Sequence, residues 1–506
     1  MRIARYIQPI ALALGLAAST AAIAAELSPV FTVTSGANWG AIGAGNGDLL
    51  TIFSGSPSGP GAYIQRFDGF GNRLQSSDWY VSADGSMMSI GASKLGDYGI
   101  AWQAADGNNV SVYARTFTRT GAAKVSTFKV NTSTQPTVFG SFVGMNETGD
   151  IVVFWSSYPG TVGSNARMLA RVFTSTGVPV TGEIEVSAAA ANNGAPQGVV
   201  VDKNGNFTCI WMGHVGSDVM TRRYARNGTP LTSITTANTY LPDGQAGMHV
   251  AINPSGQYVI AWESHGQDGD GMGIYAQRFN AAGQKVGTEI HVSEATVGDQ
   301  KDSSVGIADD GSFAIAWIDD NRRNVPSSQP SVMVRQYGAN GTPLRSADVV
   351  ATPSSGNAAN YTSLGMSPDG TFLVTWRVAT PGSTAFTMLG RRYAMDTTPY
   401  AQPVYSGVAV SGLSGATGTM RYFKLNVPSG ATKLTISTTG GTVGDADFYV
   451  RLGNIPSSTG VDFSSTQNGS TEAIQITGIP AGVWYVGLYG YAAYSGVSLT
   501  MTATAN

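Results

Sequence analysis

The sequence predicts an all-β protein, a seven-bladed β-propeller followed by a small, jelly-roll-like β-sandwich. Two signatures that each recur seven times predict the propeller, and a run of short strand-like segments after the last repeat predicts the sandwich. No segment after the first 24 residues shows a sustained helical period. The composition agrees with a loop-rich β protein, because 65 of the 506 residues are Gly and only 12% are charged.

The first 24 residues have the layout of a secretory signal peptide. Arg2 and Arg5 precede an apolar stretch, Ile10 to Ala18, which is followed by the small-residue cleavage signal Ala22-Ile23-Ala24. We therefore expect a secreted protein, extracellular, periplasmic or held at the cell surface. No later run reaches 18 apolar residues, so we expect no transmembrane segment. The net charge of −3 gives no reason to expect nucleic acid as a partner.

The repeat unit contains two signatures. The first is a Gly followed six residues later by a Trp, at Trp102, Trp155, Trp211, Trp262, Trp317 and Trp376, with a seventh copy that ends in Phe53. The second is an Arg beside an aromatic residue, usually with a Gly four residues on, as in Arg278-Phe279 with Gly283. Each unit of about 50 residues reads as four short strands separated by turns, which is typical of a propeller blade.

The ends of the repeat region predict a closed ring. The seventh unit has three strand candidates and lacks a fourth, whereas Pro29 to Ser35 reads as one additional strand. We expect this segment to pair into the last blade, because closure removes exposed sheet edges. The propeller would then span residues 27–397, with the six Trp side chains in the core between blades. The alternatives are a tandem array of small sandwiches and an exposed row of Trp side chains that stacks on sugars.

A second domain is predicted to follow a Pro-containing linker at residues 398–403. Residues 404–506 read as short strands separated by turns, which fits a small sandwich. Gly444 to Arg451, Pro480 to Val486 and Tyr494 to Val497 resemble the bacterial pre-peptidase C-terminal domain. The resemblance implies a domain that is appended to secreted hydrolases, often peptidases, and that aids export or attachment. Members commonly carry a Cys pair, which this chain lacks.

The propeller repeat carries a second resemblance. The unit from Gly256 to Val292, with Tyr275-Ala276-Gln277-Arg278-Phe279 in its third strand, resembles units of large secreted bacterial proteins of the calcium-binding, adhesin-like type. This implies an extracellular or surface setting. Acidic residues in Gly-rich loops are candidate Ca²⁺ ligands: Asp268 and Asp270, with Asp299 and Asp302, in the propeller, and Asp445 and Asp447 in the C-terminal domain. The alternative for Asp445 and Asp447 is carboxylates that cap turns, and the alternative for the propeller residues is solvated loop carboxylates.

The chain carries no motif of a common hydrolase class. The zinc-protease sequence His-Glu-x-x-His, the nucleophile elbow Gly-x-Ser-x-Gly and a phosphate loop are all absent, and Cys209 is the single Cys. Candidate residues lie instead after the Trp strand, in long loops that strand alternation places on one face. Three residues past the Trp stand Tyr158, His214, His265 and Asp320; Glu263, Arg322, Arg323 and Arg377 complete a candidate polar rim.

These observations leave three functions open. The leading hypothesis is a secreted, monomeric, non-enzymatic protein whose propeller rim binds an extracellular glycan or protein. The alternative is a secreted polysaccharide lyase or glycoside hydrolase that uses His214, His265 and Tyr158 as acid–base groups in the propeller funnel. A third hypothesis, a component of a secreted peptidase system, rests on the C-terminal resemblance alone.

Overall fold

The computed structural model describes most of the chain between residues 30 and 505. Outside the described residues lie 1–29, 36, 44–48, 57–58, 68–72, 76–78, 83–85, 94–95, 133–136, 159–165, 188–193, 214–217, 294, 322–323, 325–328, 345–347, 352–358, 369, 380–385, 396–400, 405, 416, 419, 457–459 and 506. The signal peptide predicted for residues 1–24 is therefore outside them. None of the described residues form a helix that is long and apolar enough to cross a lipid bilayer.

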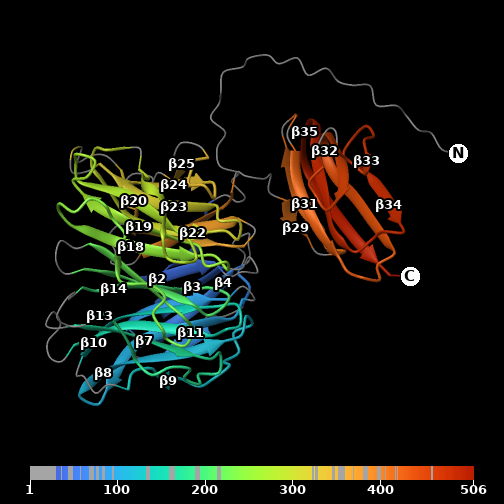
Figure 1. Ribbon diagram of the computed structural model, residues 1–506. Helices are drawn as coiled ribbons and strands as arrows, with labels where there is room; N and C mark the ends of the chain where they lie inside the picture. The colour runs from blue at the N-terminus through green and yellow to red at the C-terminus, as the bar shows by residue number, and fades with distance from the viewer. Residues whose placement is uncertain are drawn as a thin grey trace.

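Seven four-stranded antiparallel sheets form the blades of the propeller (Figure 1). From the innermost to the outermost strand, the blades are β2 (Ala37–Gly43), β3 (Leu49–Ser56), β4 (Gly59–Phe67) and β5 (Trp79–Ser82); β6 (Ser86–Ala92), β7 (Tyr98–Asp106), β8 (Asn109–Phe117) and β9 (Phe128–Lys129); β10 (Thr137–Met145), β11 (Ile151–Tyr158), β12 (Arg167–Phe173) and β13 (Ile184–Ser187); β14 (Pro196–Val201), β15 (Phe207–Met212), β16 (Val219–Tyr224) and β17 (Thr235–Thr236); β18 (Gln245–Ile252), β19 (Tyr258–His265), β20 (Met272–Phe279) and β21 (Lys285–His291); β22 (Asp299–Ile307), β23 (Phe313–Asp320), β24 (Ser331–Tyr337) and β25 (Asp348–Ala351); and β26 (Ala359–Met366), β27 (Thr371–Ala379), β28 (Phe386–Ala394) and β1 (Phe31–Ser35).

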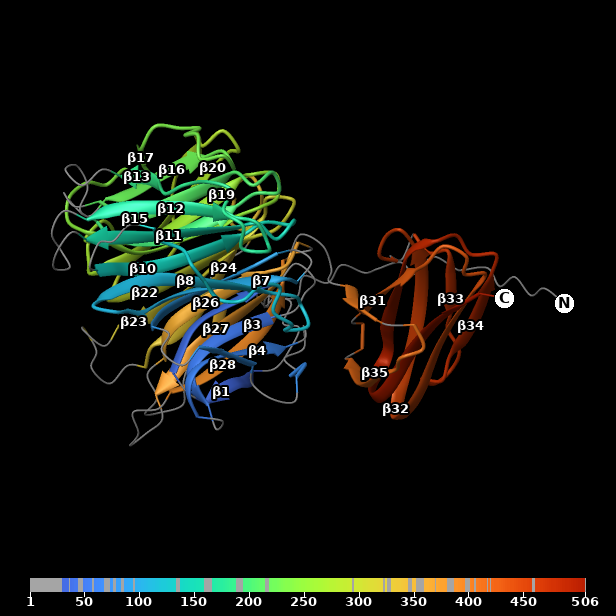
Figure 2. The same ribbon diagram turned by 90° about the horizontal axis from the view of Figure 1, so that it is seen from below.

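The ring is closed, as the sequence predicts. Each inner strand contacts the inner strands of both neighbouring blades, and β2 of the first blade contacts β26 of the seventh. The N-terminal strand β1 pairs with β28 as the outermost strand of the seventh blade, with Phe31 opposite Gly390 (Figure 2). Because the two ends of the repeat region share one sheet, the tandem array of separate sandwiches is excluded.

The Gly of the first signature forms the hairpin between the first and second strands of a blade. In the fifth blade, Gly256 has a φ of 88° and its N–H donates to the carbonyl oxygen of Asn253 at 3.0 Å. Residues with side chains rarely adopt this conformation, and a Cβ at this position would lie 2.7 Å from Arg223 Nη2. The turn therefore requires Gly, which accounts for its recurrence six residues before the Trp.

The Trp side chains lie in the core between blades. All six are buried, with relative exposures of 0–2%. Trp262, for example, belongs to a buried cluster that joins Tyr258 and Ile260 of its own blade to Ile210 and Val219 of the preceding one. This position leaves no exposed Trp face for stacking on a sugar.

The Arg of the second signature links neighbouring blades. Arg171 Nη1 donates to the carbonyl oxygen of Val130 at 2.8 Å, and Arg335 Nη1 donates to that of Val292 at the same distance. Each acceptor belongs to the preceding blade. The Arg171 guanidinium also lies 5.1 Å from the ring centroid of Phe173. The Arg and the aromatic residue of the second signature therefore recur because they hold neighbouring blades together.

The C-terminal strands form a separate, nearly closed sheet with its own core. They are β29 (Ala401–Pro403), β30 (Val410–Gly415), β31 (Met420–Val427), β32 (Lys433–Leu452), β33 (Phe463–Ser465), β34 (Ala473–Thr477) and β35 (Gly482–Thr504). The long strands β32 and β35 pair along most of their length, with register shifts between Gly440 and Ala446. Each of these two strands covers a pair of segments that read as separate strands in the sequence. The pairs are continuous because Gly residues bend the backbone without ending the strand pairing.

The last three residues of the predicted linker form a strand. Residues 401–403 form β29, which pairs in parallel with β31, with Ala401 opposite Tyr422. Ala401–Pro403, which lie in the predicted linker, are therefore part of the C-terminal sheet. Pro403 is compatible with this strand because β29 is at the edge of the sheet. Residues 398–400 lie outside the described residues.

Candidate functional site

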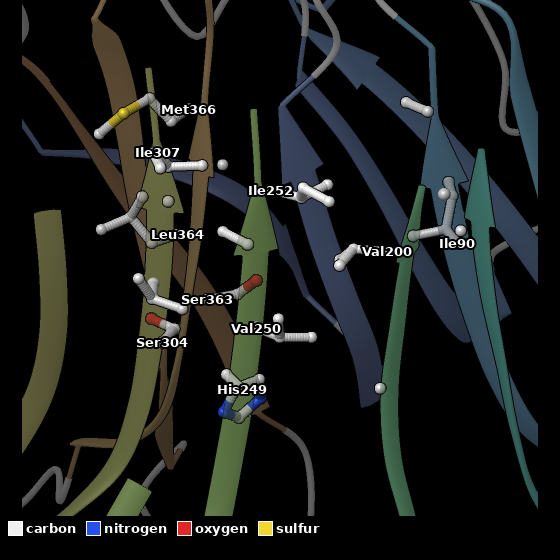
Figure 3. Close-up of a pocket in the computed structure, with 18 of the residues that line it drawn as sticks. Ile90, Val200, His249, Val250, Ile252, Ser304, Ile307, Ser363, Leu364 and Met366 are labelled. Atoms are coloured by element: carbon white, nitrogen blue, oxygen red, sulfur yellow. The ribbon is translucent and has the colours of Figure 1, made fainter. Parts of the chain in front are cut away.

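A cavity of about 730 Å³ runs along the propeller axis. The described residues that line it belong mainly to the inner strands β6, β10, β14, β18, β22 and β26 (Figure 3). At one end it reaches the hairpin turns, for example Asn253 and Pro254; at the other it reaches Glu263, Asp302, Tyr361 and Arg377. A cavity of this size, with an apolar wall and a few polar groups near its ends, is typical of a ligand site.

A ring of β-bulges surrounds the second end of this cavity. All seven inner strands shift register against the next strand near their first residues, for example between Ala246 and His249 and between Lys301 and Ser304. The bulged residues with left-handed backbone are Gly140 (φ 59°), Gly247 (φ 52°), Asp302 (φ 54°) and Tyr361 (φ 52°). Left-handed Asp and Tyr residues are strained, and such strain gathers at functional sites.

The bulges bring Glu263 against the neighbouring blade. The Oε1 atom of Glu263 accepts a hydrogen bond from the backbone N–H of Asp302 at 2.7 Å. A Cβ on Gly247 would lie 2.1 Å from the same oxygen, so only Gly lets the carboxylate occupy this position. Burial, and to a smaller extent the charges of Asp302 and Asp299, raise the pKa of Glu263 to about 7, although the hydrogen bond from the Asp302 N–H lowers it in part. At neutral pH this carboxyl group therefore exists in both protonation states.

Asp302 connects Glu263 to the seventh blade. Its Oδ2 atom accepts a hydrogen bond from the backbone N–H of Tyr361 at 3.2 Å, and its carbonyl oxygen accepts one from Thr362 Oγ1 at 2.5 Å. The Tyr361 side chain is 60% exposed. The guanidinium carbon of Arg377 lies 3.8 Å from the Tyr361 ring centroid and 5.2 Å from that of Phe386. We call Glu263, Asp302, Tyr361 and Arg377 the mouth cluster.

Polar side chains form the next layer of the cavity wall. The His249 side chain lines the cavity and is open to it, but the protein surrounds the ring on its other sides. This partial removal from water lowers the pKa of His249, so the ring is neutral at pH 7. Ser304 Oγ and Thr362 Oγ1 lie 2.9 Å apart and join the sixth and seventh blades. The mouth cluster is therefore backed by hydroxyl and imidazole groups that can exchange hydrogen bonds with a ligand.

Two residues of the predicted rim, Glu263 and Arg377, lie in the mouth cluster. A third, Asp320, is buried and accepts a hydrogen bond from Lys301 Nζ at 2.8 Å. Tyr158 is buried in the third blade, whereas His265 is exposed in the fifth, so the structure does not bring these two together. His214, Arg322 and Arg323 lie outside the described residues.

The sequence reasoning did not identify Tyr361 and assigned Asp302 only as a candidate Ca²⁺ ligand. Both residues, and also Gly140 and Gly247, stand fifteen residues before the Trp of their blade. This constant spacing is the signal that locates the bulge. It is hidden because the residue type at the position changes from blade to blade.

The candidate Ca²⁺ ligands have partners within the protein. Asp270 Oδ2 accepts hydrogen bonds from the backbone N–H of Gly298 at 3.0 Å and from Asn324 Nδ2 at 3.1 Å. Asp268 Oδ2 lies 3.8 Å from His291 Nε2. In the part of the chain that the structure describes, no group of three or more His, Cys, Asp or Glu side chains is arranged to hold a metal ion. Ca²⁺ binding at these residues stays a prediction.

The acidic pair of the C-terminal domain lies on β32. Burial, together with the nearby Asp445 and Glu472, raises the pKa of Asp447 to about 6. Glu472 is itself buried and accepts hydrogen bonds from Ser465 Oγ and from the backbone N–H of Gln467. Ca²⁺ binding by Asp445 and Asp447 also stays a prediction.

Comparisons with known proteins place the C-terminal part in a family. Residues 420–490 match the bacterial pre-peptidase C-terminal domain. The chain is 39% identical over 94 residues to alkaline serine exoprotease A of Vibrio alginolyticus, which is 19% of this chain and 17% of that protein. It is 32% identical over 119 residues to a zinc metalloprotease of Helicobacter pylori, which is 23% of this chain and 46% of that protein. The chain thus spans less than half the length of these relatives.

Three solved structures are similar to parts of the chain. A sialidase of Trypanosoma rangeli has 12% identity and a TM-score of 0.37, covering 86% of this chain and 92% of its own. An α-L-arabinofuranosidase of Fusarium graminearum has 10% identity and a TM-score of 0.37, covering 73% and 96%. The pre-peptidase C-terminal domain of a Bacillus anthracis collagenase has 15% identity and a TM-score of 0.18, covering 21% and 99%. Because all three TM-scores are below 0.5, they carry no information about what this chain binds. Residues 420–490 belong to the bacterial pre-peptidase C-terminal family, and a seven-bladed propeller precedes them in the chain.

Proposed function

We propose that this chain is an extracellular bacterial binding protein whose propeller holds a carbohydrate at the mouth cluster. The observation that carries the proposal is the ring of bulges at one end of the axial cavity. In this ring the backbones of Asp302 and Tyr361 adopt the left-handed conformation. Strained backbone persists only where the surrounding structure maintains it, and it is concentrated at binding and catalytic sites.

The chemistry of the mouth cluster suits a sugar. The exposed ring of Tyr361 offers an apolar face for the C–H side of a pyranose, and Arg377 beneath it is held in one orientation by two aromatic rings. Glu263 and Asp302 supply acceptors for hydroxyl groups, and the protonated form of Glu263 supplies a donor as well. Arg377 favours a glycan that carries a carboxylate.

The C-terminal domain supports an extracellular setting. Its relatives include a protein of Xanthomonas campestris named extracellular protease, 40% identical over 94 residues. We propose that the whole chain is secreted, and that this domain aids export or attachment to a substrate or surface. The relatives named above are proteases, but no feature of the part of the propeller that the structure describes favours a peptidase.

One observation favours a second function, hydrolysis or elimination on the bound glycan. Glycosidases keep one carboxylic acid protonated near neutral pH beside a second, ionised carboxylate. Glu263 has the raised pKa of such an acid, and it accepts a hydrogen bond from the backbone N–H of Asp302. In this alternative Glu263 is the general acid, in place of the His and Tyr residues that the sequence suggests.

The test is binding of the full mature chain to a broad glycan array, with Ca²⁺ and with EDTA. We expect a carboxylated glycan to bind, with at least tenfold weaker binding by Tyr361→Ala and by Arg377→Ala. Tyr491→Ala, which truncates a 65% exposed Tyr of the C-terminal domain, is the matched control and should bind normally. Binding that no propeller variant weakens would contradict the proposal.

Glu263→Gln separates the two functions. A binding protein should retain its affinity within a few-fold, because Gln keeps the shape and one acceptor of the side chain. A hydrolase or lyase should lose about 10²-fold or more of its turnover of the bound glycan. Reducing-end release and absorbance of unsaturated products measure the two reactions.

A further inference from the structure

We propose that the axial cavity binds an aliphatic chain attached to the sugar, so that the ligand is an amphiphile with its sugar at the mouth cluster. This inference rests on the proposed function, because the mouth cluster holds the head of the ligand. It adds the class of ligand, a sugar that carries a single alkyl or acyl chain.

The wall behind the mouth is aliphatic. Figure 3 shows aliphatic side chains of the inner strands around the cavity, among them Ile90, Val200, Val250, Ile252, Ile307 and Met366. Five of these six pack against a blade core and are only partly buried there: Ile90, Val250, Ile252, Ile307 and Met366. All five also line the cavity, where contact of an aliphatic side chain with water is unfavourable and contact with an alkyl chain is favourable.

The cavity is polar at both ends and mainly aliphatic between them. The mouth cluster and the layer of His249 and Ser304 occupy one end, Glu147, Lys203 and Asp309 line the hairpin end, and the aliphatic residues lie between, together with Ser363. The polar mouth and the aliphatic stretch next to it match the head and the chain of an amphiphile. The inner strands are about 25 Å long, so the aliphatic stretch accommodates an extended chain of several carbons. A cavity of about 730 Å³ lies within the range of small-ligand sites.

A water-filled cavity is the competing explanation. The inner strands are sheet edges, and the peptide groups along an edge bind water when no strand covers them. In that case an alkyl chain would not raise the affinity of a sugar bound at the mouth, because the chain would displace water from the peptide groups. The two explanations therefore differ in how affinity depends on chain length.

The experiment measures affinity for methyl, butyl, hexyl and octyl β-D-glucuronides by calorimetry, with the full mature chain and below the micellar concentration of each compound. We expect affinity to rise by up to about fourfold per added CH₂ group, and at least tenfold from methyl to octyl. Val250→Thr, which makes the wall polar without changing its shape, should reduce this gain. Val178→Thr is the matched control, because Val178 is 57% exposed and lies outside the cavity, and this variant should not reduce the gain.

The outcomes separate this inference from the proposed function. Equal affinity for the methyl and octyl compounds overturns the inference and leaves sugar binding at the mouth intact. A gain with chain length that persists unchanged in Val250→Thr and in Ile307→Thr also overturns it, because the chain then binds elsewhere. A third outcome is that the wild type gains affinity with chain length, that Val250→Thr and Ile307→Thr lose this gain, and that Arg377→Ala binds every compound as well as the wild type. In that case the cavity binds the chain and the proposed sugar site fails.

Discussion

Glu263 makes the stability of the propeller depend on pH. Its pKa is raised from 4.5 to about 7, chiefly by burial and to a smaller extent by the charges of Asp302 and Asp299, while the hydrogen bond from the Asp302 N–H lowers it in part. A carboxyl group whose pKa is higher in the folded state binds its proton more tightly there than in the unfolded chain. Folding stability is therefore lost as the pH rises from about 4.5 through about 7, and a shift of this size corresponds to about 3 kcal/mol. Glu263→Gln cannot ionise and should not show this loss.

The assay is urea unfolding of the wild type and of Glu263→Gln at pH 4.5, 5.5, 6.5 and 7.5, followed by Trp fluorescence. Eight of the nine Trp residues lie in the propeller region, so the signal reports mainly on that domain. We expect the difference in free energy of unfolding between variant and wild type to grow in favour of the variant by about 2–3 kcal/mol over this range. A difference that stays constant with pH would refute the burial and the charge environment assigned to Glu263.

Three further predictions concern the ring and its bulges. Removing Phe31–Ser35 takes away β1 and leaves β28 as an open edge, so the melting temperature should fall and light scattering should show association; an unchanged melting temperature would mean that the ring does not depend on this strand. Trp262→Ala should cost about 3–5 kcal/mol in chemical unfolding, while the exposed Tyr491→Ala should cost under about 0.5 kcal/mol. Gly247→Ala places a Cβ 2.1 Å from Glu263 Oε1 and should abolish the pH dependence described above; a variant with wild-type pH dependence would contradict the contact.

Much of the fold could be predicted because the repeat places the same physical requirement in every blade. The hairpin needs a left-handed Gly, as at Gly256, and the space between blades needs a large buried ring, as at Trp262. Each requirement selects one residue type, Gly or Trp, at the same position of the repeat, so the two residues recur at a constant spacing. The closing strand was predictable for a related reason, since the seventh unit lacks a strand that only the N-terminal segment supplies.

The candidate site was predictable only in part. Glu263 and Arg377 stand directly after a Trp, so the repeat itself placed them at one end of the blades. Their partners were not found, because the bulge tolerates Gly, Asp or Tyr and its backbone conformation is not visible in residue type. In the C-terminal domain the sequence predicts short, separate strands, whereas at Gly440 and Gly441 the backbone bends within one continuous strand.

The measurement that tests the central claim most directly is a titration of the strongest array glycan into the wild type and into the double variant Tyr361→Ala/Arg377→Ala. The two side chains contact each other at the mouth of the axial cavity, and neither contributes to a blade core cluster. Circular dichroism and the melting temperature confirm that the double variant is folded. Binding at the mouth cluster predicts a loss of affinity of at least a hundredfold in the double variant. Wild-type affinity in a folded double variant would contradict it and place the binding site elsewhere on the protein.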